Sequence, residues 1–363
     1  MNVKIPGWTD GKTAVIQNGK SKIVRSESYN YDFNSVTGFF ARWGKTRDDD
    51  PQIAPESEIL DIEVSTICKG PGGKLCKFCY KANTPNGKNM SFETFKIIVD
   101  KMKYSQEDKR IGITQLAIGA DAQCESNPDI WKMMEYSRKC HIIPNITIAD
   151  ISDETADKLS SLAGAVAVSR YDDKNLCYDS VKKLTDLGMD QVNIHAMISQ
   201  ESLEQVKETI LDYHTDPRLT KMKAIVLLSL KQQGRGVGFK PLTQSQFKEL
   251  VDLAIENNVQ VGFDSCGAHS FINAIKDHPN YDMLVQQAEP CESTLFSSYI
   301  NVEGKFFPCS FVEDTPGWED GIDVVAAESF ESVWNDERTI QFRNKLHSCG
   351  RNCPVFTVNG VKV

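Results

Sequence analysis

The sequence predicts a mixed α/β protein in which six parallel strands form a partial (β/α)6 barrel of the TIM type, followed by a smaller C-terminal unit. From residue 58 onward, short apolar runs alternate with amphipathic stretches, which is typical of a parallel sheet covered by helices. The last hundred residues instead carry a β-hairpin pattern flanked by cysteines. We therefore expect an N-terminal extension (1–57), a barrel (58–258) and a C-terminal domain (259–363).

The six predicted strands are short runs rich in Val, Ile and Leu, as expected for strands that are buried on both faces. They cover residues 59–65, 114–120, 145–150, 165–170, 191–199 and 222–231. Three of the intervening helical stretches begin with a hydroxyl that can cap the first turn, at Ser91, Ser152 and Thr243. In such a barrel the chemistry takes place at the carboxyl ends of the strands.

The N-terminal extension is marked by a cluster of aromatic residues. They are Tyr29, Tyr31, Phe33, Phe39, Phe40 and Trp43. We expect one or two strands packed against the side of the barrel, and the alternative is a lid over its mouth.

Composition excludes several classes of protein. The 363 residues are 40% hydrophobic and 25% charged, as in ordinary globular proteins. No signal-peptide pattern and no long apolar span is found, so a cytoplasmic protein without a membrane segment is the expectation. The net charge of −9 argues against an extended nucleic-acid surface. Eleven cysteines in such a chain favour metal or redox chemistry over disulfides.

Three cysteines follow directly on the first predicted strand: Cys68, Cys76 and Cys79. Three thiolates on one loop can hold three irons of a [4Fe–4S] cluster and leave the fourth iron open. Residues 69–75 are rich in Gly and Pro, so they indicate a looped insertion between the ligands. Zinc, which prefers four ligands, and three unrelated buried cysteines are the alternatives.

The C-x-aromatic-C ending of this loop, with Phe78 as the aromatic, resembles the cluster loop of radical S-adenosylmethionine (SAM) enzymes. The family's usual spacing is C-x3-C-x2-C, and the first gap here has seven residues. The resemblance covers residues 58 to about 258 and implies a six-unit partial barrel. It also implies that SAM binds the open iron through its amino and carboxylate groups.

A second set of cysteines lies near the C-terminus. Cys291 and Cys309 flank a hairpin pattern with a turn at Gly304, while Cys349 and Cys353 lie on a C-x3-C turn. Four thiolates suit either a zinc site or a fully ligated [4Fe–4S] cluster. The C-x12-G-x4-C spacing resembles the SPASM and twitch auxiliary-cluster domains of radical SAM enzymes. Because only four cysteines are present, the resemblance implies a twitch-like domain with one auxiliary [4Fe–4S] cluster held by these four.

Four cysteines belong to neither set. Cys140 and Cys177 fall in helical patterns and are expected in the core, and Cys124 follows a strand end. Cys266 joins the barrel to the C-terminal domain. Three roles are open for Cys266. It could pack inertly, donate a hydrogen atom to a substrate radical, or serve as a substitute cluster ligand.

The resemblance also points to SAM-binding residues at the strand ends. These are Phe78, Gly119, Asp121, Ser169, Arg170, Asn193 and His195. Gly119 permits close approach of the backbone to a ligand, and Arg170 suits the SAM carboxylate. Asn193 and His195 suit ribose hydroxyls, with a hydrogen-bonded core histidine as the alternative. The basic loop 231–236 is expected to reach SAM, an acidic substrate group or only solvent.

The function that the resemblance implies is reductive cleavage of SAM to a 5′-deoxyadenosyl radical that abstracts hydrogen from a substrate carbon. The electron would come from a reductant such as flavodoxin or ferredoxin. A ribosomally synthesised peptide is the first candidate substrate, although the extension is too short for a complete peptide-recognition domain. The alternatives are a small molecule (an aminosugar, an amino acid or a nucleoside) and, from another class, an iron–sulfur electron-transfer protein without SAM chemistry.

Overall fold

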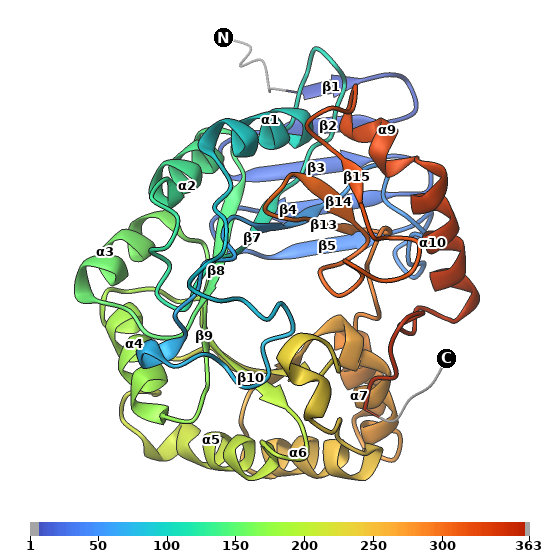
Figure 1. Ribbon diagram of the computed structural model, residues 1–363. Helices are drawn as coiled ribbons and strands as arrows, with labels where there is room; N and C mark the ends of the chain where they lie inside the picture. Colours follow the sequence, from blue (N-terminus) through green and yellow to red (C-terminus); the bar gives the residue numbers. More distant parts are fainter. Residues whose placement is uncertain (1–6, 360–363) are drawn as a thin grey trace.

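The computed structural model describes residues 7–359, whose backbone forms two β-sheets with helices around them (Figure 1). The larger sheet has ten strands in the order β12-β11-β10-β9-β8-β7-β6-β13-β14-β15. All neighbours from β12 to β13 pair in parallel, whereas β14 and β15 are added antiparallel. The predicted mixed α/β fold with a parallel-dominated sheet is confirmed.

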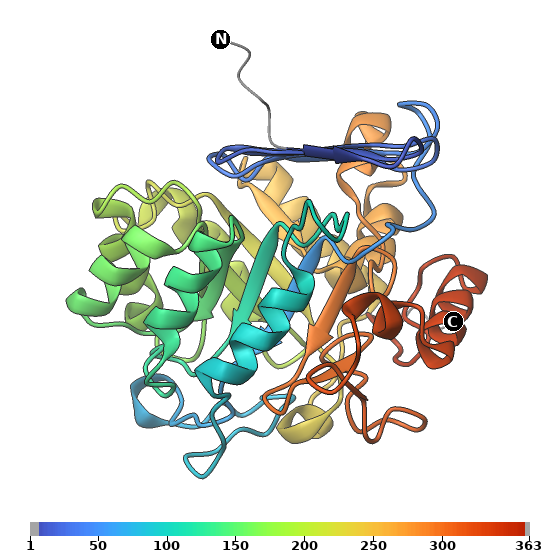
Figure 2. The same ribbon diagram turned by 90° about the horizontal axis from the view of Figure 1, so that it is seen from above.

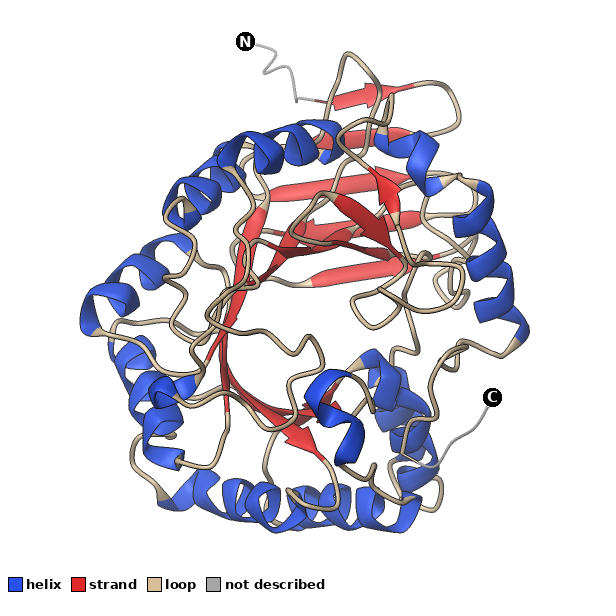
Figure 3. Ribbon diagram, viewed as in Figure 1, coloured by secondary structure: helices blue, strands red, loops and turns tan. Residues whose placement is uncertain are grey.

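All six predicted strands are present. They are β6 (Ile59–Glu63), β7 (Gln115–Gly119), β8 (Ile143–Ile148), β9 (Val166–Ser169), β10 (Val192–Ile198) and β11 (Ala224–Ser229). A seventh parallel strand, β12 (Val261–Phe263), was not predicted because three residues centred on a glycine are too few to form an apolar pattern. At the described ends of the sheet, β12 and β15 do not pair with each other, so the sheet is curved but open (Figure 3).

Helices cover the outer face of the curved sheet (Figure 3). They are α1 (Phe92–Met102), α2 (Ile130–Lys139), α3 (Asp153–Leu162), α4 (Lys174–Asp186), α5 (Leu203–Thr215) and α6 (Gln244–Glu256). The predicted caps are confirmed, since Ser91, Ser152 and Thr243 each accept a hydrogen bond from the first turn of α1, α3 and α6. None of the helices in residues 7–359 is long and apolar enough to span a membrane.

The two faces of the sheet differ in character. In β6, Leu60 and Ile62 pack into the apolar core, whereas Asp61 and Glu63 lie on the other face. The same alternation places His195 of β10 on the inner face. Because successive side chains of a strand point to opposite faces, the core lies between sheet and helices and the polar side chains face the enclosed space.

The C-terminal segment continues the same sheet. After α7 (Ala268–Ile275) and the short α8 (Tyr281–Leu284), strand β13 (Ser297–Ile300) pairs in parallel with β6, with Tyr299 opposite Asp61. The predicted hairpin is formed by β13 and β14 (Lys305–Phe307), and β15 (Ile322–Asp323) extends it. Helices α9 (Phe330–Trp334) and α10 (Glu337–Ser348) then lead to the last cysteines.

The N-terminal residues form a five-stranded antiparallel sheet instead of one or two strands. Its strands are β1 (Gly7–Thr9), β2 (Ala14–Gln17), β3 (Ser21–Arg25), β4 (Asn30–Asn34) and β5 (Phe40–Trp43). Figure 2 shows this sheet edge-on, lying across one end of the larger sheet.

Side-chain contacts show that this is the amino end of the parallel strands. Lys22 Nζ bonds the carbonyl oxygens of Ile111 (2.8 Å) and Gly112 (2.6 Å), just before β7, and the Tyr29 hydroxyl donates to Glu58 Oε1 (2.8 Å), just before β6. The alternative of a lid over the mouth is therefore wrong. So is packing on the side of the barrel, because the apolar face of this sheet covers the strand ends opposite to the cysteine loop.

Candidate cofactor and substrate site

A cavity of about 480 Å³ lies at the carboxyl ends of the parallel strands. Its lining includes the predicted cluster ligands Cys68, Cys76 and Cys79, together with inward-facing residues of β6, β7, β9, β10, β11 and β13. The predicted loop and the enclosed face of the sheet thus form one site. A volume of this size is typical of small-molecule and cofactor sites.

The insertion between Cys68 and Cys76 is a well-anchored loop. Gly70 has a φ of 76°, and a Cβ there would overlap the carbonyl of Lys74, so only glycine fits. The Gly72 N–H donates to Asp150 Oδ2 at 3.3 Å, and Gln123 Nε2 donates to the Gly70 carbonyl at 3.2 Å. The long first gap therefore folds against the ends of β7 and β8 without displacing the cysteines from the cavity.

Arg235 fixes the other side of the cysteine loop. Its Nε donates to the carbonyl of Cys76 at 2.8 Å, and its Nη1 donates to the carbonyl of Asn83 at 3.0 Å. Its backbone N–H reaches the Cys79 carbonyl at 3.0 Å. The loop 231–236 was expected to contact SAM, a substrate or solvent, and instead this arginine holds the backbone of the cysteine loop.

The donor set of this loop fits a cluster with one open iron. It provides three thiols, and no fourth Cys or His lies between residues 68 and 79. In residues 7–359 no group of three or more His, Cys, Asp or Glu side chains is arranged to hold a single metal ion. Burial raises the pKa of the Cys76 thiol to about 11, and metal binding would release that proton.

Phe78 lines the cavity and belongs to an aromatic group. Its ring stacks on Tyr171 with 5.6 Å between centroids and meets Phe239 edge to face at 5.9 Å. This arrangement places a group of packed aromatic rings beside the cysteines.

Gly119 and Asp121 also line the cavity at the end of β7. The carboxylate of Asp121 accepts the backbone N–H groups of Glu125 (3.0 Å) and Ser126 (2.9 Å). It therefore shapes the turn after β7 with its own hydrogen bonds. A Cβ at Gly119 would make only ordinary contacts, so space alone does not explain this glycine.

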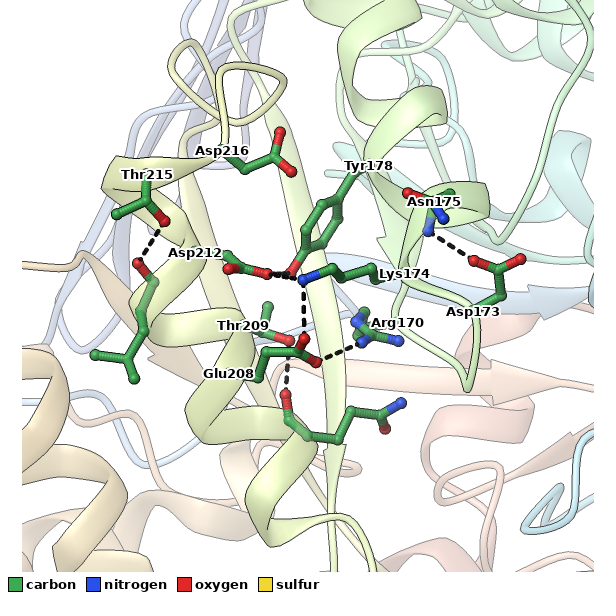
Figure 4. A network of polar contacts seen from close by, with 12 residues as sticks. Arg170, Asp173, Lys174, Asn175, Tyr178, Glu208, Thr209, Asp212, Thr215 and Asp216 are labelled. Carbon is green, nitrogen blue, oxygen red and sulfur yellow. Dashed lines mark hydrogen bonds and ion pairs between the residues drawn. The ribbon is translucent and has the colours of Figure 1, made fainter.

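Arg170 is buried at the end of β9, and Ser169 beside it also lines the cavity. Its guanidinium is turned towards the helices, where Nη2 donates to Glu208 Oε2 at 3.1 Å (Figure 4). Lys174 contacts the other oxygen of Glu208 at 2.8 Å. In this arrangement Arg170 already has a carboxylate partner, which weakens the argument for a SAM carboxylate there.

His195 lines the cavity from β10, while Asn193, two residues earlier on the same face, is not part of the described lining. Burial lowers the pKa of His195 to about 4, and the nearby Asp264 opposes this only in part. The imidazole is therefore neutral at neutral pH and can offer one donor and one acceptor.

An ion-pair network beside the cysteine loop was not predicted from the sequence. Lys81, which follows Cys79 closely, contacts Tyr299 Oη at 3.0 Å, Glu63 at 3.4 Å and also Glu313. Glu63, an acid at the end of a largely apolar strand, was the available signal. The network ties the cysteine loop to the C-terminal hairpin.

The second set of cysteines differs from the prediction by one member. Cys266, Cys291, Cys309 and Cys353 are close enough for their thiolates to influence one another. Burial, followed by the neighbouring Cys266, raises the pKa of Cys309 to about 12.

Cys349 lies apart from this group. Its thiol donates to the carbonyls of Leu346 at 3.3 Å and Asn352 at 3.1 Å, and the described thiol that influences it is Cys353. The structure thus brings Cys266 into the place that the sequence assigned to Cys349. This grouping favours the substitute-ligand alternative for Cys266.

The two cysteine sites are also joined by aromatic packing. The rings of Tyr80, next to Cys79, and Phe311, close after Cys309, have centroids 4.5 Å apart. The segments that follow the two cysteines are therefore in direct contact.

Comparison with known proteins adds a family for the C-terminal part. No curated protein matches the chain. Among solved structures, the HpcH/HpaI aldolase from Desulfitobacterium hafniense DCB-2 matches 68% of this chain and 87% of its own, with 10% identity and a TM-score of 0.33. Residues 291–354, which contain Cys291, Cys309, Cys349 and Cys353, match the family model of SPASM, an iron–sulfur cluster-binding domain.

Proposed function

We propose that this protein is a radical SAM enzyme with one auxiliary [4Fe–4S] cluster. The observation that carries the proposal is the cavity lined by three cysteines of one loop, in a chain whose C-terminal segment is similar to an iron–sulfur cluster-binding domain. SPASM domains occur in radical SAM enzymes, and this supports the assignment of the first loop. Three thiols without a fourth leave a coordination position for SAM.

The first cluster would be held by Cys68, Cys76 and Cys79. Arg235 holds the backbone of this loop in place through its hydrogen bond to the Cys76 carbonyl. The chemistry supplied at this site is one-electron reduction of SAM to methionine and a 5′-deoxyadenosyl radical, which removes hydrogen from a substrate carbon. Phe78 offers a stacking surface for adenine. A substrate bound in the cavity would help to keep water and stray hydrogen donors away from the reacting atoms.

The auxiliary cluster would be held by Cys266, Cys291, Cys309 and Cys353. These thiols are mutual neighbours, and full cysteine ligation leaves no open iron for SAM. A flavodoxin or ferredoxin is the expected source of electrons. A protein that only transfers electrons through both clusters remains the alternative from another class, and it would need a fourth ligand at the first loop.

For the substrate we propose a single side chain of a ribosomally made peptide, inserted into the cavity. A small molecule is a second candidate that two observations favour. The cavity of about 480 Å³ is small once SAM is bound. In addition, the aromatic N-terminal sheet covers the opposite end of the strands and cannot extend a peptide groove.

The decisive experiment is 5′-deoxyadenosine formation by anaerobically reconstituted, reduced protein with SAM. We expect slow, reductant-dependent product and about eight irons per chain. Replacing Cys68, Cys76 and Cys79 together by Ala should abolish the product and leave about four irons. Cys140→Ala, in neither cysteine set, serves as the control.

Retained SAM cleavage in the triple variant would refute the assignment of the loop. If the wild type forms no product, a shift of its cluster EPR signal on adding SAM separates an enzyme that waits for substrate from a loop that does not bind SAM. No shift would overturn the proposal.

A further inference from the structure

Asp61 is a carboxylate in the middle of β6, between the apolar residues Leu60 and Ile62, and it faces the cavity. Its neighbours across the sheet are Ala117 on β7 and Tyr299 on β13. It lies on the same inner face as Glu63. Glu63 ends the strand and leads to the cysteine loop, and Asp61 lies two residues before it, further from the loop. An acid at this position is costly to the fold unless a partner or a function compensates it.

The two acids of β6 differ in how they are satisfied. Glu63 is paired with Lys81 and accepts the backbone N–H of Val302 at 3.4 Å. No described residue donates a hydrogen bond to the carboxylate of Asp61 or forms an ion pair with it within 4 Å. The charged group that influences its pKa is another acid, Glu292, which raises it further.

No lining cation is free to compensate Asp61. Lys81 is held by Glu63 and Glu313, Arg170 by Glu208, and Lys231 by Asp264 at 2.7 Å. The described cavity therefore has one unmatched acidic group. A carboxylate of this kind can be paired by a cation or by a strong N–H donor of the molecule that binds in the cavity.

We propose that Asp61 binds a protonated amino group of the substrate and so positions the substrate in the cavity beside the cysteine loop. This inference rests on the proposed function for its identification of the ligand as substrate. An ammonium group could also come from SAM itself, because SAM carries one. The experiment must therefore separate these two sources.

The test uses reconstituted, unreduced protein and two probes of equal length, hexylammonium and 1-hexanol, in ligand-detected NMR titrations. A charge-assisted hydrogen bond should make hexylammonium bind the wild type about tenfold more tightly than 1-hexanol. Asp61→Asn, which keeps the shape and removes the charge, should lose this preference. Asp252→Asn, a matched charge change on the exposed face of α6, should keep it.

The same variants are titrated with SAM. We expect Asp61→Asn to bind SAM within about twofold of the wild type, which would leave the substrate as the source of the ammonium. A loss of SAM affinity of about tenfold would assign the ammonium to SAM and overturn the proposal. Equal binding of the two hexyl probes by the wild type, or an unchanged preference in Asp61→Asn, would overturn it as well.

These outcomes are independent of catalysis. If the protein cleaves SAM but shows no preference for the amine, only the proposed role of Asp61 is refuted, and the radical SAM assignment stands. An amine preference without SAM cleavage and without a shift of the cluster EPR signal on adding SAM would refute the radical SAM assignment and leave an amine-binding cavity.

Discussion

Replacing Asp61 by Asn should stabilise the folded protein, because the carboxylate is half-buried and has no hydrogen-bond or ion-pair partner among the described residues. Burial, reinforced by Glu292, raises the pKa of Asp61 from 3.8 to about 7. At about 1.4 kcal/mol per pKa unit, this difference corresponds to at most about 4 kcal/mol of stability lost when Asp61 is ionised. Solvent in the cavity and the unsatisfied amide of Asn reduce the expected gain to about 1–3 kcal/mol.

The sign follows from proton linkage. The folded state holds the proton of Asp61 more tightly than the unfolded state, so wild-type stability falls as pH rises from about 4 to about 7 and is then constant. The advantage of Asp61→Asn should therefore be largest near pH 8 and shrink by more than half near pH 5. For a chain of this size, thermal melting of the anaerobic protein should show a rise of about 2–6 °C at pH 8.

A variant that melts at or below the wild-type temperature at pH 8 would refute the view of Asp61 as an unpaired, buried acid. So would a gain that is the same at both pH values, because proton linkage requires the difference to depend on pH. Asp252→Asn, on the exposed side of α6, should leave the melting temperature nearly unchanged at either pH.

Three further predictions concern the cysteine sites. Cys266→Ala should lower the iron content from about eight towards about four per chain, while Cys349→Ala should leave it near eight; the reverse result would restore the ligand set predicted from sequence. Lys231→Met removes a buried cation beside Cys266 and should lower the midpoint potential of the auxiliary cluster in a redox titration followed by EPR; an unchanged or higher potential would contradict this placement. Gly70→Ala should reduce iron at the first cluster and 5′-deoxyadenosine formation, because a Cβ overlaps the backbone there. Gly19→Ala, which has open space, is its control, and equal effects of the two changes would count against the loop geometry.

The strands and the first cysteine loop were predictable because their signals are local. Each buried strand is a continuous apolar run, and the three cysteines directly follow the first of them. The helix caps at Ser91, Ser152 and Thr243 are equally local, since the donor lies within three residues of each cap. These features need no knowledge of distant contacts.

The contacts that the sequence could not reveal join residues that are far apart along the chain. Arg170 suits an external carboxylate until α5 places Glu208 against it, 38 residues further along the chain. Cys349 and Cys353 look like a ligand pair because they are close in sequence, but in the structure the thiol that lies close to Cys291, Cys309 and Cys353 is that of Cys266. The direction in which the N-terminal sheet packs is likewise fixed by contacts such as that between Lys22 and Ile111, which no local pattern reveals.

The pairing of β13 with β6 limits how the chain can be divided. The backbone groups on one side of β6 hydrogen-bond to β13, so a fragment that ends at residue 258 would expose β6 as a bare edge strand. Such a fragment should aggregate, and removing the C-terminal unit would also leave Lys81 without Glu313. The parallel part of the sheet and the C-terminal unit are therefore expected to unfold together, and the distance between the two cysteine sites is fixed by neighbouring strands of one sheet.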